Sequence, residues 1–184
     1  MAPDIRVYTI AEQLLACAYE QVSQTDGGEP TRACVVAGAL AWDSCGGGCS
    51  QLTISLNNIY AASSFPVPAE TTASQFGGNK CGHPMVVATM TATILRCVPG
   101  PGPNGEPPSC EDLAEAALIA VQDAAAVRAG VECCLMDMAT RVDGVKVITG
   151  WTTGSQNFLG PEGFCGGSQL PIRVGILNNC ACGD

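Results

Sequence analysis

Residues 84–129 constrain the fold most, because they join an alternating segment, a Pro/Gly-rich hinge and an Ala-rich segment in direct succession. From Val86 to Leu95, small or apolar residues alternate with residues that are mostly Thr. This period of two predicts a long strand with one apolar face and one largely Thr-lined face. Residues 99–105 read PGPGPNG and cannot continue a ladder, because proline lacks an N–H and glycine favours turning.

A long helix is predicted directly after this hinge. Ser109 is a natural N-cap, and Glu111 and Asp112 fall in the first turn, where the helix dipole favours negative charge. Apolar residues then recur at spacings of three and four, which indicates one apolar stripe. The stripe consists of Leu113, Ala117, Ala120, Ala124, Val127 and Val131. We expect the helix to end at or near Cys133 and Cys134.

The N-terminal part of the chain predicts one helix and two strands. A capping box at Thr9 and a helix-spaced stripe predict a helix from there to about Gln24, which Asp26-Gly27-Gly28 stops. Residues 34–42 form an apolar run typical of a buried strand, and residues 52–57 alternate in polarity. With a Gly-rich turn at 43–49 between them, residues 34–60 predict a β-hairpin.

The remaining segments complete a prediction of an α+β fold. Residues 61–83 and 154–167 are expected to be long loops, and residues 142–151 and 170–176 are expected to be strands. The predicted order is α-β-β-β-α-β-β, within a single domain over residues 1–184. Hairpin-like links favour a mostly antiparallel sheet of four to five strands, with two helices packed on one face. The other face is left for solvent or for another subunit.

The charge composition excludes several classes of partner. The formal net charge is −9, and only 14% of the residues are charged. An acidic protein is not attracted to nucleic acid or to an anionic membrane surface. No apolar run approaches the ~20 residues of a membrane helix, and the N-terminal residues lack the features of a secretory signal. We therefore expect a soluble, compact protein that binds no membrane.

Twelve cysteines make the chain cysteine-rich. Cys17, Cys97, Cys133 and Cys134 fall in or near predicted regular elements, and for some of these the interpretation is a buried free thiol that behaves as a small hydrophobe. The cysteines in predicted loops are better candidates for disulfides, although spacing does not reveal pairing. They are Cys45, Cys49, Cys81, Cys165, Cys180 and Cys182.

No familiar catalytic motif occurs in the chain. The P-loop, dinucleotide-binding and zinc-protease patterns are all missing from the sequence, and the one histidine, His83, lies in a predicted loop without a triad partner. We therefore expect no catalytic residue and no cofactor, and interpret the protein as a non-enzyme. One chemical alternative stays open, because Cys45, Cys49, Cys81 and His83 together offer three thiolates and an imidazole suited to zinc.

Several segments, in matching order along most of the chain, resemble the tail terminator proteins of long-tailed (siphovirus-type) bacteriophages. No single segment is diagnostic, and the resemblance rests on their order and spacing. The segments are Trp42-Asp43-Ser44-Cys45, Gly48, Gln51-Leu52, Tyr60, Phe65-Pro66, residues 94–99, residues 105–108, the Ala-rich helix with Asp123, and residues 160–163. The additional cysteines depart from the family pattern.

The resemblance implies a virion structural protein that assembles as a hexameric ring at the head–tail junction. Such a ring caps the finished tail tube, ends its polymerisation and joins the tail to the head-side connector. The implied partners are further copies of the chain, the major tail tube protein and a stopper or neck protein, with genomic DNA only passing through the lumen. The implied location is the virion tail, after assembly in the host cytoplasm.

Other interpretations remain open at the level of sequence. The head-to-tail stopper or adaptor of the same connector is a close neighbour of the terminator. A zinc-bound interaction module and a cysteine-dependent enzyme represent two other classes, and the latter needs a thiolate beside an activating base. Trp42, Trp151 and Tyr60 are candidate interface residues, because aromatic residues are enriched at interfaces, or else members of the core.

Overall fold

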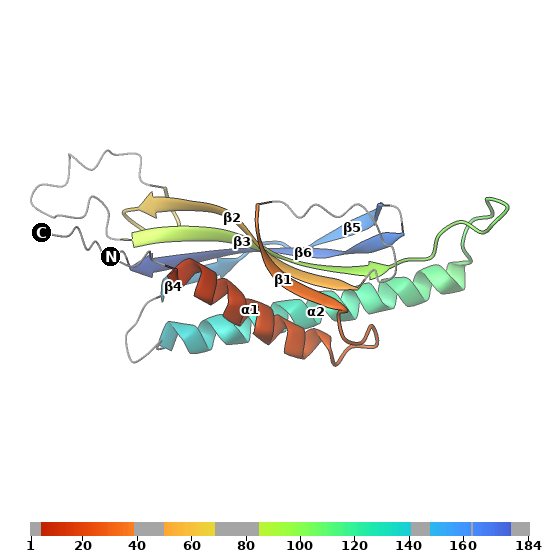
Figure 1. Ribbon diagram of the computed structural model, residues 1–184, viewed down its shortest axis with the longest axis horizontal. Coiled ribbons are helices and arrows are strands. Elements are labelled where there is room, and N and C mark those ends of the chain that lie inside the picture. The colour runs from red at the N-terminus through yellow and green to blue at the C-terminus, as the bar shows by residue number, and fades with distance from the viewer. Residues whose placement is uncertain (1–4, 39–49, 69–84, 141–147, 163, 178–184) are drawn as a thin grey trace, which may run out of the picture.

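The computed structural model (Figure 1) describes residues 5–38, 50–68, 85–140, 148–162 and 164–177. Two helices and six strands lie within these residues. In chain order they are α1 (Arg6–Val22), β1 (Arg32–Ala37), β2 (Gln51–Ala62), β3 (Met85–Cys97), α2 (Cys110–Thr140), β4 (Ile148–Thr153), β5 (Asn157–Glu162) and β6 (Cys165–Leu177).

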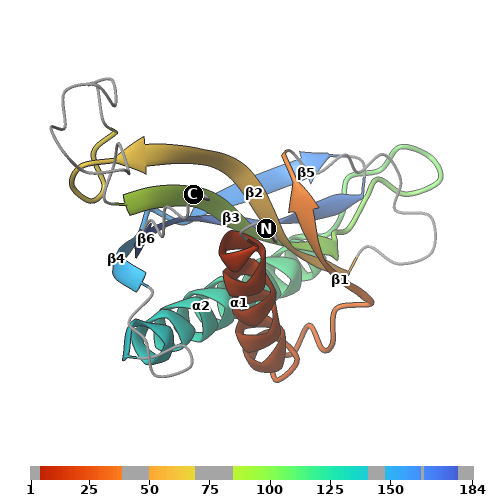
Figure 2. The same ribbon diagram turned by 60° about the vertical axis from the view of Figure 1, so that its left-hand side comes forward.

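The six strands form one mixed sheet in the order β1-β2-β3-β6-β4, with β5 also paired to β6. β3 and β6 pair antiparallel over their full lengths, from Met85 opposite Leu177 to Cys97 opposite Cys165. β4 and β5 share the outer edge of β6, one at each end of it. Both helices cover the same face of the sheet (Figures 1 and 2). The predicted α+β class, with a mostly antiparallel sheet and two helices on one face, is therefore confirmed, but the sheet has six strands rather than the predicted four to five.

The predicted hairpin over residues 34–60 is wrong, because β1 and β2 are parallel. Their register runs from Arg32 opposite Gln51 to Ala37 opposite Leu56. The chain leaves β1 at Gly38, whose φ of 77° suits a glycine, and β2 begins at Gln51, opposite the first residue of β1. A parallel pair needs a connection of about a dozen residues, and the chain between the two strands supplies it.

The predicted loop at 154–167 is also wrong, since it contains β5 and the first residues of β6. Gly160, Gly166 and Gly167 belong to strands. A Cβ at Gly167 would collide with the Ile94 backbone, and one at Gly166 would lie 2.9 Å from the Val98 side chain. These glycines let β6 approach the end of β3 closely. In the other predicted loop, 61–83, residues 61 and 62 end β2, and residues 69–83 lie outside the described part of the chain.

The two helices differ from prediction at their ends. α1 begins at Arg6, so Thr9 lies inside it, where its Oγ1 donates a hydrogen bond to the Ile5 carbonyl at 3.3 Å. The predicted capping box is therefore wrong. The cap of α2 is confirmed, because the Asp112 N–H donates to Ser109 Oγ at 3.1 Å. α2 continues to Thr140, which places both Cys133 and Cys134 well inside it.

The core lies between the sheet and the two helices. The even-numbered face of β3, including Ala88, Met90 and Ile94, is buried against them, as the alternation predicts. α1 contributes Leu14 and Ala18, and α2 approaches it closely at Gly130, where a Cβ would lie 2.7 Å from the Cys17 carbonyl oxygen. Close helix packing at one glycine thus brings the middle of α1 onto α2.

Candidate interaction groove

An open apolar groove lies where α2 extends beyond α1. α2 has 31 residues and α1 has 17, so α1 can cover only part of α2. The N-terminal half of α2 and the adjacent end of the sheet enclose a volume of about 780 Å³. Its apolar walls come from the end of β3, from α2 and from β5, and they include Ile94, Pro99, Leu113, Ala120, Phe158 and Leu159.

The predicted stripe of α2 divides into a buried half and an exposed half. Val127 and Val131 are fully buried in the core. Leu113, which begins the same stripe, is 47% exposed, and Ala117 is also exposed. Beside the groove, Val121 and Phe158 expose 55% and 58% of their surfaces. Exposed apolar side chains gathered around a concave surface are typical of an interaction site.

A buried ion pair forms the inner, polar end of the groove. Arg96 donates two hydrogen bonds to Asp123, from Nε at 2.7 Å and from Nη2 at 3.2 Å. Their side chains are only 11% and 1% exposed. Thr25 Oγ1 donates to Asp123 at 2.6 Å, and Arg96 also donates to the Gly28 carbonyl and to Ser50 Oγ. The pair therefore ties β3, α2 and the segment after α1 together at the point where the groove begins.

Arg96 lies in the segment 94–99 of the resemblance and Asp123 in its Ala-rich helix, and their pairing was not predicted from the sequence. A signal was present in the alternation of β3. Arg96 continues the even-numbered series that includes Ala92 and Ile94, so it points toward the helices. A charged residue on a buried face needs a charged partner from the covering helix.

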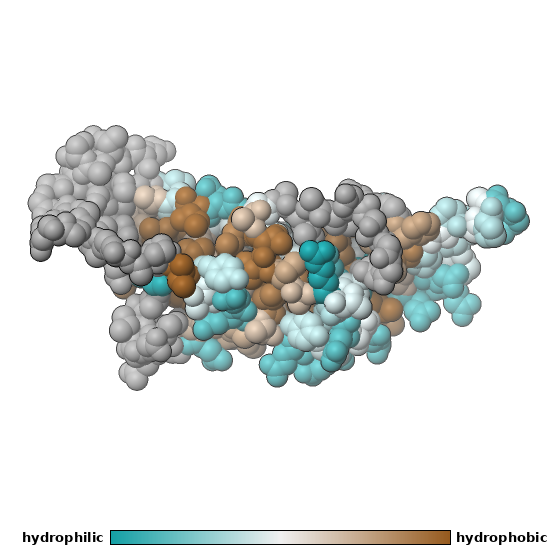
Figure 3. All heavy atoms as spheres, viewed as in Figure 1, coloured by the Kyte–Doolittle hydropathy of each residue, from teal (hydrophilic) through white to brown (hydrophobic). Residues whose placement is uncertain are grey.

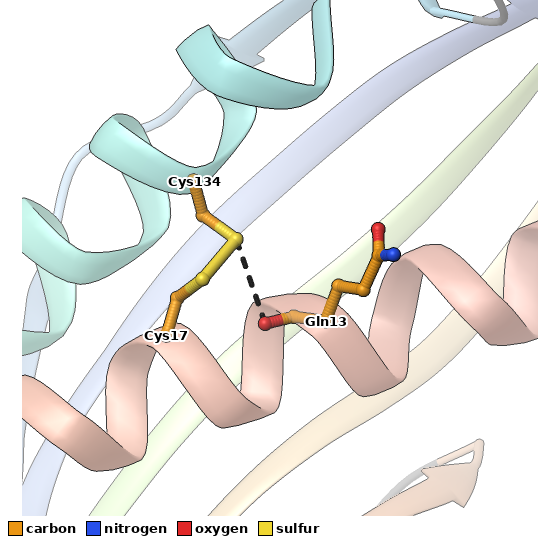
Figure 4. The surroundings of a disulfide bond; sticks show 3 residues. All are labelled: Gln13, Cys17 and Cys134. Carbon is orange, nitrogen blue, oxygen red and sulfur yellow. Dashed lines mark hydrogen bonds between the residues drawn. A yellow bond between two sulfur atoms is a disulfide. The ribbon is translucent and has the colours of Figure 1, made fainter. Parts of the chain in front are cut away.

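A disulfide joins α1 to α2 through Cys17 and Cys134, whose Cα atoms are 6.1 Å apart (Figure 4). The Cys134 sulfur also lies 3.5 Å from the carbonyl oxygen of Gln13. Cys97 and Cys165 are disulfide-bonded as well. The free-thiol interpretation is therefore wrong for Cys17, Cys97 and Cys134. For Cys17 and Cys134 the packing of the two helices brings thiols together that are distant in sequence.

The other described cysteines are free thiols. Cys133 is free, as that interpretation predicts, but it is exposed rather than buried. Cys110 is free and exposed at the start of α2, and Cys34 is free and half-buried. Cys165 was predicted to form a disulfide from its place in a supposed loop, and it does so from a strand.

The residues of the zinc alternative, Cys45, Cys49, Cys81 and His83, lie outside the described residues, as do Cys180, Cys182 and Trp42. Within residues 5–38, 50–68, 85–140, 148–162 and 164–177, no cluster of three or more His, Cys, Asp or Glu side chains is placed to hold a metal ion. Across the same described segments, neither helix is both long and apolar enough to cross a membrane.

Two of the aromatic candidates have structural contacts within the chain. The Tyr60 hydroxyl donates a hydrogen bond to the Pro66 carbonyl at 2.7 Å, next to the cis peptide bond between Phe65 and Pro66. Tyr60, Phe65 and Pro66, which all belong to segments of the resemblance, therefore lie close together at the end of β2. Trp151 is half-buried and packs against the core. The exposed aromatic residue at the groove is instead Phe158, which sequence reasoning placed in a loop.

Figure 3 shows the hydropathy of one face of the molecule. In Figure 3, hydrophobic atoms are visible between the sheet and the helices, and the projecting start of α2 with the preceding residues is mostly hydrophilic. Comparison with family models and with curated proteins found no match. The fold and the groove thus define a small α+β protein with an open apolar groove.

Proposed function

We propose that this protein is a virion structural protein that forms a ring on the tail tube of a long-tailed bacteriophage. The ring ends polymerisation of the tube and joins the tail to the head-side connector. Its partners are further copies of the chain, the major tail tube protein and a stopper or neck protein. In this role the protein is not an enzyme and needs no cofactor.

The observation that carries the proposal is the uncovered apolar groove along the N-terminal half of α2. A subunit of a ring needs a surface that a neighbour covers, and an exposed apolar groove is one kind of surface that serves for such contacts. Leu113, Val121 and Phe158 each expose about half of their surface beside the groove. Their exposure supports association with another protein, and the resemblance supplies the kind of assembly.

Charge and cysteine chemistry agree with this proposal. A net charge of −9 suits a lumen through which DNA passes without binding, because like charges repel. The bond between Cys17 and Cys134 suits a particle that persists outside the cell, since disulfides survive in oxidising surroundings and are rare in the cytosol. We expect the Cys17–Cys134 disulfide to form late, during or after release of the particle.

Negative-stain microscopy of the purified chain, with and without the tail tube protein of the same phage, tests the proposal. Rings that form alone or on the head-proximal ends of tubes support it, and tubes should then stop growing when the chain is added. Rings that bind the head-side connector but leave tube growth unchanged favour the stopper instead. A persistent monomer without any effect on tube growth contradicts both roles.

A further inference from the structure

We propose that the inner end of the groove binds a small uncharged amphiphile, a molecule with a straight apolar chain and an amide or ester head. The chain lies between α2 and the sheet, and the head accepts hydrogen bonds from Arg96 and Ser50, which both line the groove. This inference goes beyond the proposed assembly and does not depend on it. The proposed ring contact uses the exposed residues Leu113, Val121 and Phe158, whereas the ligand uses the buried end of the groove.

The groove has room for a ligand because small residues line it on the helix and on the sheet. α2 contributes Ala116 and Ala120, and β6 contributes Gly166 and Gly167. Ile94 of β3 adds a larger apolar surface to the same wall of the groove. The volume of about 780 Å³ lies in the range of small-molecule sites, which are mostly apolar with a few polar groups. The space therefore suits an apolar chain.

The polar end of the groove holds hydrogen-bond donors that the protein does not use. Of the five N–H groups of the Arg96 guanidinium, two donate to Asp123, one to the Gly28 carbonyl and one, from Nη1, to Ser50 Oγ. Among the residues that the structure describes, neither the second Nη1 hydrogen nor the Ser50 hydroxyl hydrogen has an acceptor. Arg96 is only 9% exposed. Because a buried donor is costly to leave without an acceptor, this end favours a ligand atom that accepts.

The charges at the polar end select an uncharged head. Asp123 already neutralises Arg96 through hydrogen bonds of 2.7 and 3.2 Å. Asp26 also lines the groove, and its carboxylate accepts from the neutral side chain of Gln122. A carboxylate head therefore meets two aspartates against one arginine, and an ammonium head has only donors to offer to the donors of Arg96.

Binding of octanamide to the full chain tests the inference, with octanoate and octylammonium as charged analogues of equal chain length. Isothermal titration calorimetry is done at a protein concentration at which light scattering shows a monomer, so that no neighbouring copy covers the groove. We expect one octanamide per chain, bound about tenfold more tightly than either analogue, because burying a charge is costly. Hexanamide should bind about fourfold more weakly for each methylene it lacks.

Matched variants locate the binding site. Ala117 is exposed and lines the groove, so Ala117→Phe should fill the space and weaken octanamide binding by about tenfold. Ala114 is also exposed on α2 but does not line the groove, so Ala114→Phe should leave the affinity unchanged. Ser50→Ala removes one donor and should weaken octanamide binding roughly two- to tenfold, with the same difference between octanamide and hexanamide. Circular dichroism checks that each variant folds.

A preference for octanamide that weakens in Ala117→Phe and in Ser50→Ala supports the proposal. Equal affinity for octanoate, binding that Ala117→Phe leaves unchanged, or no binding at millimolar octanamide each overturns it. The proposed function is measured separately by ring formation. Rings without octanamide binding therefore overturn this inference alone, and octanamide binding by a chain that never assembles, alone or on tail tubes, overturns the proposed function alone.

Discussion

Loss of the bond between Cys17 and Cys134 should destabilise the protein strongly. The two cysteines are 117 positions apart, so the bond closes a long loop in the unfolded chain. The chain-entropy relation gives about 4.9 kcal/mol at 25 °C for a loop of that length. The bonds at Cys97 and Cys165 already restrict the unfolded chain, so we expect the double variant Cys17→Ala/Cys134→Ala to lose ~3–5 kcal/mol of unfolding free energy.

Urea denaturation followed by circular dichroism measures this loss. The matched control is Cys110→Ala/Cys133→Ala, which removes two exposed free thiols and should change the unfolding free energy by less than about 0.5 kcal/mol. Wild-type protein in reductant should move toward the double variant. A loss below about 1 kcal/mol in the double variant would refute the reasoning, because the long loop would then contribute almost nothing.

Three further predictions concern single interactions. Asp123→Ala should cost ~3–5 kcal/mol in urea denaturation, because Arg96 would stay buried without its partner, and Arg96→Met/Asp123→Leu should recover much of that loss. Ser109→Ala should lower the melting temperature through about 1 kcal/mol of lost capping, and unchanged melting would contradict this. The hydrogen bond and charge of Glu12 raise the pKa of Tyr8 above its ordinary value of 10.0. The contact of Glu12 with the protonated Tyr8 phenol therefore stabilises the folded protein below pH 10, and this stabilisation is lost as the pH rises through the raised pKa. Glu12→Gln should lower the phenol midpoint in an absorbance titration, and an unmoved midpoint would exclude that cause.

Local patterns predicted the parts of the fold that depend on neighbouring residues. The alternation of residues 86–95 gave β3 with its correct buried face, and Ser109 gave the start of α2. The direction of β1 could not be predicted, because it depends on the path by which the chain returns to Gln51. β5 was missed because its neighbours Gly166 and Gly167 resemble loop residues, although they serve close strand packing.

The candidate site depends on contacts between distant residues, and sequence reasoning therefore found only its parts. Leu113 and Val127 belong to one helical stripe, and periodicity cannot tell that α1 is too short to cover the first of them. The pairs Arg96–Asp123 and Cys17–Cys134 likewise form only after the helices pack on the sheet. Cysteine spacing in particular carries no information about a partner 117 positions away.

Native mass spectrometry of the purified chain, with and without its tail tube protein, tests the central proposal most directly. We predict a closed assembly of six copies of the 18.8 kDa chain, either free or on the tube. Its subunits should fall apart when Leu113→Glu places a charge in the groove. A wild-type chain that remains monomeric at micromolar concentration, and that ignores the tube, would contradict the account.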